Sequence, residues 1–121
     1  MKIEFDKNFI EIDINQFSEM LEDSYYLLPN KYNQYCELII KNNSIVCHAT
    51  DGYHLLRSEI KDVKTSFTAQ GFFNGETIKL VNRFLLDYKE KTFKIYCEEN
   101  NKGLFFVLDN LAIFYLISVN P

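Results

Sequence analysis

Apolar and polar residues alternate along most of this chain, which is the pattern of half-buried β-strands. The pattern first appears over residues 2–6 and 9–14. In the first half of the chain, the strands predicted after that are 35–41, 44–50 and 53–60. In the second half, the predicted strands are 66–73, 92–97, 104–109 and 112–119. Short polar turns separate most neighbouring strands, so we expect antiparallel hairpins.

Two stretches carry apolar residues at helical spacing instead. We expect the first helix to have Asn15 as its N-cap and to end before Pro29. We expect Asn74 to cap the second helix, with Gly75 just inside it. The apolar stripe of the second helix is Ile78, Val81, Leu85 and Tyr88, widened by Leu80 and Phe84.

The order strand, helix, three strands therefore occurs twice, over residues 9–60 and 66–119. This order predicts an α+β fold in which a βαβββ unit is duplicated and two adjacent helices lie on one face of antiparallel sheet. A chain of 121 residues is the usual length of one domain, so we expect residues 1–121 to form a single domain.

Charge and composition exclude several classes of function. The net charge of −4 argues against binding of nucleic acid by charge alone. No apolar run approaches the roughly 20 residues of a membrane helix, and the N-terminus lacks a signal-peptide pattern, so a cytoplasmic location is expected. The three cysteines, Cys36, Cys47 and Cys97, include no CxxC pair and indicate buried thiols rather than a zinc site or disulfides.

Signatures of catalysis are missing from the sequence. It contains none of the common phosphate-binding, zinc-protease or serine-hydrolase motifs, so we expect no enzyme activity and no cofactor. His48 and His54 lie near one hairpin but have no evident third ligand, so no metal site is expected. Asp51 and Gly52 are typical of a two-residue hairpin turn with positive φ angles.

The segment that contains this turn, SIVCHATDGYHLLRSEI, resembles a signature of the bacterial sliding clamp, the beta subunit of DNA polymerase III. In that family a strand ending in ATDG leads directly into the next strand of the middle domain. The resemblance extends to residues 71–85, to the final hairpin ending in IFYLISVNP, and to 17–28 at the place of the first helix. It implies the clamp fold, with helices facing a central DNA hole. It also implies a protein that encircles DNA and tethers replication and repair proteins through short peptide motifs.

The family's peptide groove is built partly by residues around ATDG. Carried over, these residues are Thr50, Gly52, Tyr53, His54 and Leu55. Alternation along a strand predicts that Tyr53 and Leu55 form an apolar wall, with Thr50 and Gly52 at its rim and His54 facing solvent more. The position after Tyr53 is usually basic in the family and is His54 here.

The chain departs from the family in two respects. Family members carry three such domains, whereas this chain carries one, so part of the groove is missing. The helices that face DNA should be positive, but the first one carries Glu19, Glu22 and Asp23 with no base. If DNA is contacted, the residues expected to do so are Lys79, Arg83, Lys89 and Lys91, with weak, sequence-independent and salt-sensitive binding.

Three hypotheses follow from the sequence. The first is a stand-alone, single-domain clamp homologue that acts in replication or repair, by assembling into a homo-oligomeric ring or by binding partner peptides. The second is a clamp-fold interaction or regulatory module that does not encircle DNA. The third is an unrelated α+β domain, binding or enzymatic, in which ATDG is only a turn. The acidic first helix favours the second hypothesis over the first.

Overall fold

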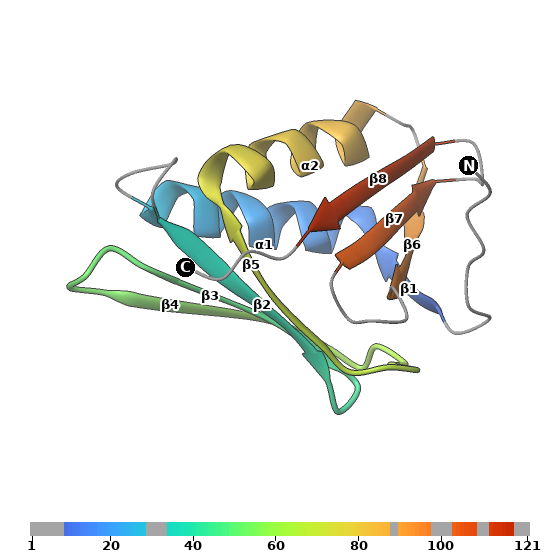
Figure 1. Cartoon of the computed structure of the whole chain (residues 1–121). Helices are drawn as coiled ribbons and strands as arrows, with labels where there is room; N and C mark the ends of the chain where they lie inside the picture. The colour runs from blue at the N-terminus through green and yellow to red at the C-terminus, as the bar shows by residue number, and fades with distance from the viewer. Residues whose placement is uncertain (1–8, 29–33, 88–89, 98–102, 109–111, 118–121) are drawn as a thin grey trace.

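Two antiparallel four-stranded sheets and two helices make up the fold in a computed structural model of the chain (Figure 1). The structure describes residues 9–28, 34–87, 90–97, 103–108 and 112–117, the last of these by their backbone alone. The strand predicted over residues 2–6 lies outside the described residues.

The element order confirms the duplicated βαβββ plan and the α+β fold class. The first unit consists of β1 (Phe9–Asp13), α1 (Ile14–Leu27), β2 (Tyr35–Lys41), β3 (Ser44–Thr50) and β4 (Leu55–Lys61). The second consists of β5 (Ala69–Asn74), α2 (Gly75–Asp87), β6 (Thr92–Cys97), β7 (Gly103–Leu108) and β8 (Ala112–Ile117). Three strands, β2, β3 and β6, match the predicted ranges residue for residue, and the others differ at their ends.

The two units exchange their first strands. One sheet has the order β1-β6-β7-β8, so β1 pairs with strands of the second unit. The other has the order β4-β3-β2-β5, so β5 pairs with a strand of the first unit. Each sheet thus contains a strand from the other half of the chain, so strand pairing joins the two units.

The start of α1 corrects the prediction. Asp13, not Asn15, is the N-cap, and its carboxylate accepts a hydrogen bond from the Gln16 N–H at 2.9 Å. The helix starts at Ile14 because this residue is buried in the core, only one residue after β1 ends. The cap of α2 is as predicted, since the Asn74 side chain accepts from the Thr77 N–H at 2.9 Å. Pro29 lies outside the described residues.

Both helices lie side by side on one face of the sheets, as expected (Figure 1). The Ser18 hydroxyl of α1 donates to the Asn82 side chain of α2 at 2.6 Å. On α2, Ile78, Val81 and Leu85 are buried as predicted. Leu80 is 53% exposed, so it does not widen the stripe as expected. Phe84 packs against the core, and Tyr88 lies outside the described residues.

Phe17, Phe93 and Phe106 form the centre of the core. Their ring centroids are 5.1 to 5.6 Å apart, and each residue is at most 2% exposed. Because Phe17 belongs to α1 while the other two belong to β6 and β7, this cluster joins the first unit to the second. Aromatic pairs with tilted or edge-on geometry at such distances stabilise a core beyond the area they bury.

The cysteines follow the sequence expectation in part. Cys36 and Cys47 are buried thiols, whereas Cys97 is only half-buried. The Ser24 hydroxyl lies 3.1 Å from the Cys47 sulfur. A hydrogen bond with Cys47, together with burial, raises the pKa of the Cys36 thiol, so Cys36 stays protonated and unreactive. Neither α1 nor α2, the helices that the structure describes, has the length and apolar character needed to cross a membrane.

Candidate functional site

The connection between β3 and β4, which we call the ATDG turn (residues 50–55), is longer than predicted. Thr50 pairs with Leu55, so four residues rather than two separate the strands, and β4 begins at Leu55 rather than at Tyr53. Within the turn only Gly52 has a positive φ, of 93°. The two-residue Asp-Gly hairpin is therefore wrong. Its place is taken by a turn that the Asp51 side chain organises.

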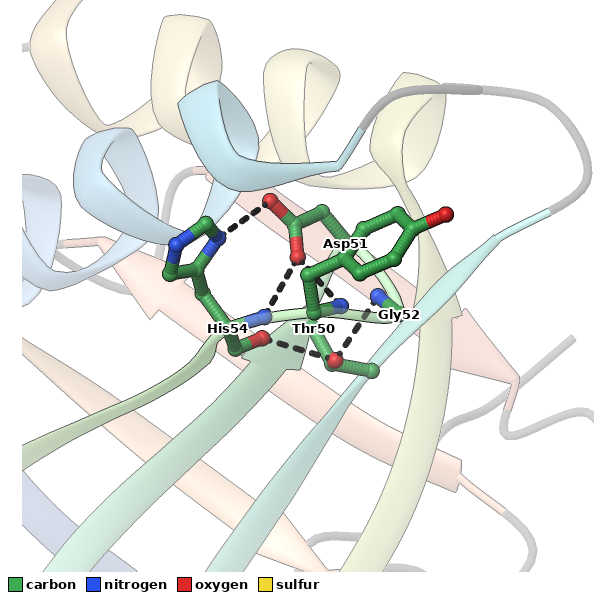
Figure 2. A network of polar contacts seen from close by, with 5 residues as sticks. Thr50, Asp51, Gly52 and His54 are labelled. Atoms are coloured by element: carbon green, nitrogen blue, oxygen red, sulfur yellow. Dashed lines mark hydrogen bonds and ion pairs between the residues drawn. The ribbon is translucent and has the colours of Figure 1, made fainter.

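The Asp51 carboxylate holds the turn together (Figure 2). One oxygen accepts hydrogen bonds from the backbone N–H of Tyr53 at 2.8 Å and of His54 at 2.6 Å. The other lies 2.9 Å from Nδ1 of His54. The hydrogen bond with the His54 ring and the two backbone N–H groups favour the ionised carboxylate and lower the pKa of Asp51 to about 2. Asp51 is therefore ionised throughout the neutral pH range.

The Thr50 hydroxyl closes the opposite side of the turn (Figure 2). It accepts from the Gly52 N–H at 3.0 Å and donates to the His54 carbonyl at 2.8 Å. Such side chain–backbone bonds are the usual means by which Asp and Thr replace a backbone ladder. Local hydrogen bonds thus order the turn, and burial of its apolar side chains contributes little.

Two large apolar side chains are left in solvent by this arrangement. Tyr53 is 93% exposed and Leu55 is 71% exposed. The prediction that His54 faces solvent more than Tyr53 does is wrong. Tyr53 lies in the turn ahead of the strand, so strand alternation does not apply to it. The His54 side chain is 77% exposed and contacts Asp51. The turn does bring all five predicted groove residues together. Neighbouring exposed apolar side chains that include a tyrosine are a feature of protein-binding surfaces.

The sequence analysis missed Tyr35 at this site. Glu37 pairs with His48, so continuing the register places Tyr35, the first residue of β2, beside Thr50 and on the same face of the sheet as Leu55. Tyr35 is half-buried and extends the apolar surface of the turn. The alternation of residues 35–41 was the signal that could have placed it there.

The two histidines do not converge. Nδ1 of His48 lies 3.2 Å from a Glu37 oxygen on the neighbouring strand, while His54 contacts Asp51. In the described part of the chain, no three His, Cys, Asp or Glu side chains are grouped as metal ligands would be.

The residues predicted to face DNA are only partly described. Lys79 and Arg83 are exposed on α2, Lys91 is exposed beyond its end, and Lys89 lies outside the described residues. Beside α2 lies α1, with three exposed acids and no base. Because α2 has two acids and two bases, the two helices together carry a net charge of −3. This charge repels a phosphate backbone.

Sequence comparison finds no family model and no curated protein that matches the chain. Comparison of structures does find matches. The chain is similar to the DNA polymerase III beta subunit of Pseudomonas aeruginosa, with a TM-score of 0.79 and 12% identity over 100% of this chain and 33% of that one. It is similar to the beta subunit of Thermotoga maritima, with a TM-score of 0.76 and 16% identity over 98% of this chain and 33% of that one.

A third match is a Helicobacter pylori beta clamp that was solved bound to a DNA ligase peptide. Its TM-score is 0.75 and its identity 17%, over 93% of this chain and 30% of that one. This chain thus spans about a third of the length of the clamps that it matches. In the Pseudomonas aeruginosa comparison the match covers the whole of this chain, and so both βαβββ units. The chain therefore has the fold of the bacterial sliding clamp, over about a third of that protein's length.

Proposed function

We propose that this chain is a binding module with the sliding-clamp fold, without enzyme activity, that docks short peptide motifs of replication or repair proteins at its ATDG turn. The observation that carries the proposal is the exposure of Tyr53 and Leu55 on a turn that hydrogen bonds of Asp51 and Thr50 stabilise. The clamp resemblance points to the same residues, and one clamp of this fold was solved with a ligase peptide bound.

The chemistry of the turn suits an anchor of Leu and an aromatic residue. Leu55 and Tyr53, with Tyr35 alongside, offer apolar surface to such side chains. Nothing lies within 4 Å of the place where a Gly52 side chain would stand, so a partner backbone can approach closely there. Because one domain supplies about half of a clamp groove, we expect affinities on the order of tens to hundreds of micromolar.

Assembly into a homo-oligomeric ring is a second candidate. It is favoured by the open outer edge of β4, which has no neighbouring strand within the described residues. The net charge of −3 on the helices disfavours a ring that holds DNA tightly. Contact with DNA through Lys79, Arg83, Lys89 and Lys91 would then be weak and lost at moderate salt. Light scattering over a range of concentrations distinguishes a ring from a monomer.

The test of peptide docking is a titration with a peptide that contains Leu and Phe, followed by amide NMR shifts. We expect shifts between Thr50 and Leu55. The Leu55→Ala variant should bind more weakly, whereas Leu80→Ala, which removes an exposed leucine on α2, should bind as the wild type does. If no residue from Thr50 to Leu55 shifts at millimolar peptide, the proposed function fails and only the fold remains.

A further inference from the structure

The face of the β4-β3-β2-β5 sheet that is turned away from the helices forms a groove of about 570 Å³. The register places it next to the ATDG turn. From the Thr50–Leu55 pair at the turn, successive pairs on this face are His48–Arg57, Val46–Glu59 and Ser44–Lys61. The last three pairs line the groove. From Leu55 to Lys61 the strand advances six residues, or about 20 Å, which an extended peptide of about six residues spans.

The groove has apolar side chains on its floor, and at the end far from the turn Lys41 and Lys61 line it together with Asp62. Its floor includes Val46, which is 7% exposed, and Ile39. At the far end Lys41 and Lys61 both pair with Ser44, one from each side, so their side chains flank the same residue. Between the turn and these lysines lies Arg57, which is half in solvent.

The acids of this face are largely engaged with partners on the face itself. Glu59 accepts from Arg57 at 3.2 Å, and Glu37 contacts both His48 and the Gln70 amide. Asp62, directly after β4, is the remaining acid that lines the groove. None of the ion pairs among the described residues involves Lys41 or Lys61. Their ammonium groups can therefore take up a carboxylate from a partner.

We propose that the peptide docked at the ATDG turn continues along this groove, and that acidic residues about six positions from its apolar anchor pair with Lys41 and Lys61. The inference rests on the proposed function and adds a partner class: a peptide with an apolar anchor and an acidic extension. A polyanionic nucleic acid suits the groove less well. Its regularly spaced phosphates would meet Glu37, Glu59 and Asp62 as well as the lysines, whereas a peptide places its few carboxylates at one end.

The experiment compares synthetic peptides that share one Leu and Phe anchor. The first ends at the anchor, the second adds six residues with three Glu, and the third has Lys in place of those Glu; the extension is tested at either end. At low salt we expect the Glu peptide to bind about fivefold tighter than the anchor alone, and the gain to shrink as salt is raised. The amides of Lys41, Ser44 and Lys61 should shift only with the Glu peptide.

The double variant Lys41→Gln, Lys61→Gln should remove the gain without changing binding of the anchor peptide. The control is Lys79→Gln, an exposed lysine on α2, which should keep the gain. Equal binding of the Glu and Lys peptides, or shifts confined to the turn, would overturn this inference and leave the proposed function standing. No shift at the turn with any peptide would overturn both.

Discussion

Aromatic side chains serve opposite purposes in two regions of this molecule. In the core, Phe17, Phe93 and Phe106 are almost wholly removed from solvent and pack against one another. In the ATDG turn, Tyr53 is almost wholly in solvent. The backbone is ordered in both regions, but burial orders the core, whereas hydrogen bonds from Asp51 and Thr50 order the turn.

Because of this difference, we expect the residues that stabilise the fold and the residues that bind a partner to be different ones. A side chain that contributes little buried area to the fold can be lost with little change in the free energy of unfolding. The apolar area of Tyr53 and Leu55 is instead available for burial by a partner. Substitutions in the core should therefore reduce the population of folded protein, and substitutions at the turn should reduce affinity.

The largest effect is expected in the core. Replacing Phe106 by Ala removes a ring that contacts both Phe17 and Phe93, and should lower the free energy of unfolding by about 3–5 kcal/mol. Urea unfolding measures this loss. The exposed Leu86 provides the control, since Leu86→Ala should change stability by less than about 0.5 kcal/mol. A loss below about 1 kcal/mol for Phe106→Ala would show that the aromatic cluster contributes little to the stability of the packing between the two units.

At the ATDG turn, substitutions should reduce peptide affinity and leave the free energy of unfolding nearly unchanged. Leu55→Ala should cost about 1–2 kcal/mol of peptide binding through lost apolar burial, and Tyr53→Ala should weaken binding likewise. Both should leave the unfolding free energy within about 0.5 kcal/mol of the wild type. Calorimetric or NMR titration gives the first quantity and urea unfolding the second. A variant that loses stability and binding together would contradict the separation.

The sequence predicted the core more accurately than the turn, and the reason is physical. The core follows from alternation and helical spacing, which is why β2, β3 and β6 were predicted residue for residue. The exchange of β1 and β5 between the sheets was not predicted, because pairing between strands far apart in sequence leaves no local pattern. At the turn, Asp-Gly favoured a two-residue hairpin, but the Asp51 side chain bonds the N–H groups of Tyr53 and His54 and stabilises a longer loop.

A smaller effect is expected from Gly52. Its φ of 93° is a conformation that residues with a side chain rarely adopt, although there is open space around the position. Gly52→Ala should therefore lower stability through backbone strain alone, by about 1 kcal/mol. The control is Thr68→Ala, at an exposed site outside the turn, which should change stability by less than about 0.5 kcal/mol. If Gly52→Ala is neutral, the turn adopts another conformation at no cost.

The smallest effect is the response of the turn to acid. The pKa of Asp51 is lowered to about 2, so the folded chain holds this proton less tightly than the unfolded chain does. The stabilisation from Asp51 is therefore complete above the unfolded pKa of about 4. It is lost as the pH falls through about 2.

The backbone amides of Tyr53 and His54, which donate to this carboxylate, should report the change by NMR with a midpoint near pH 2. Asp51→Asn should abolish that titration while other acid-induced shifts persist. A midpoint at the ordinary value for an aspartate would show that the carboxylate does not hold the turn, and the separation between a buried core and a self-supported turn would then lose its main support.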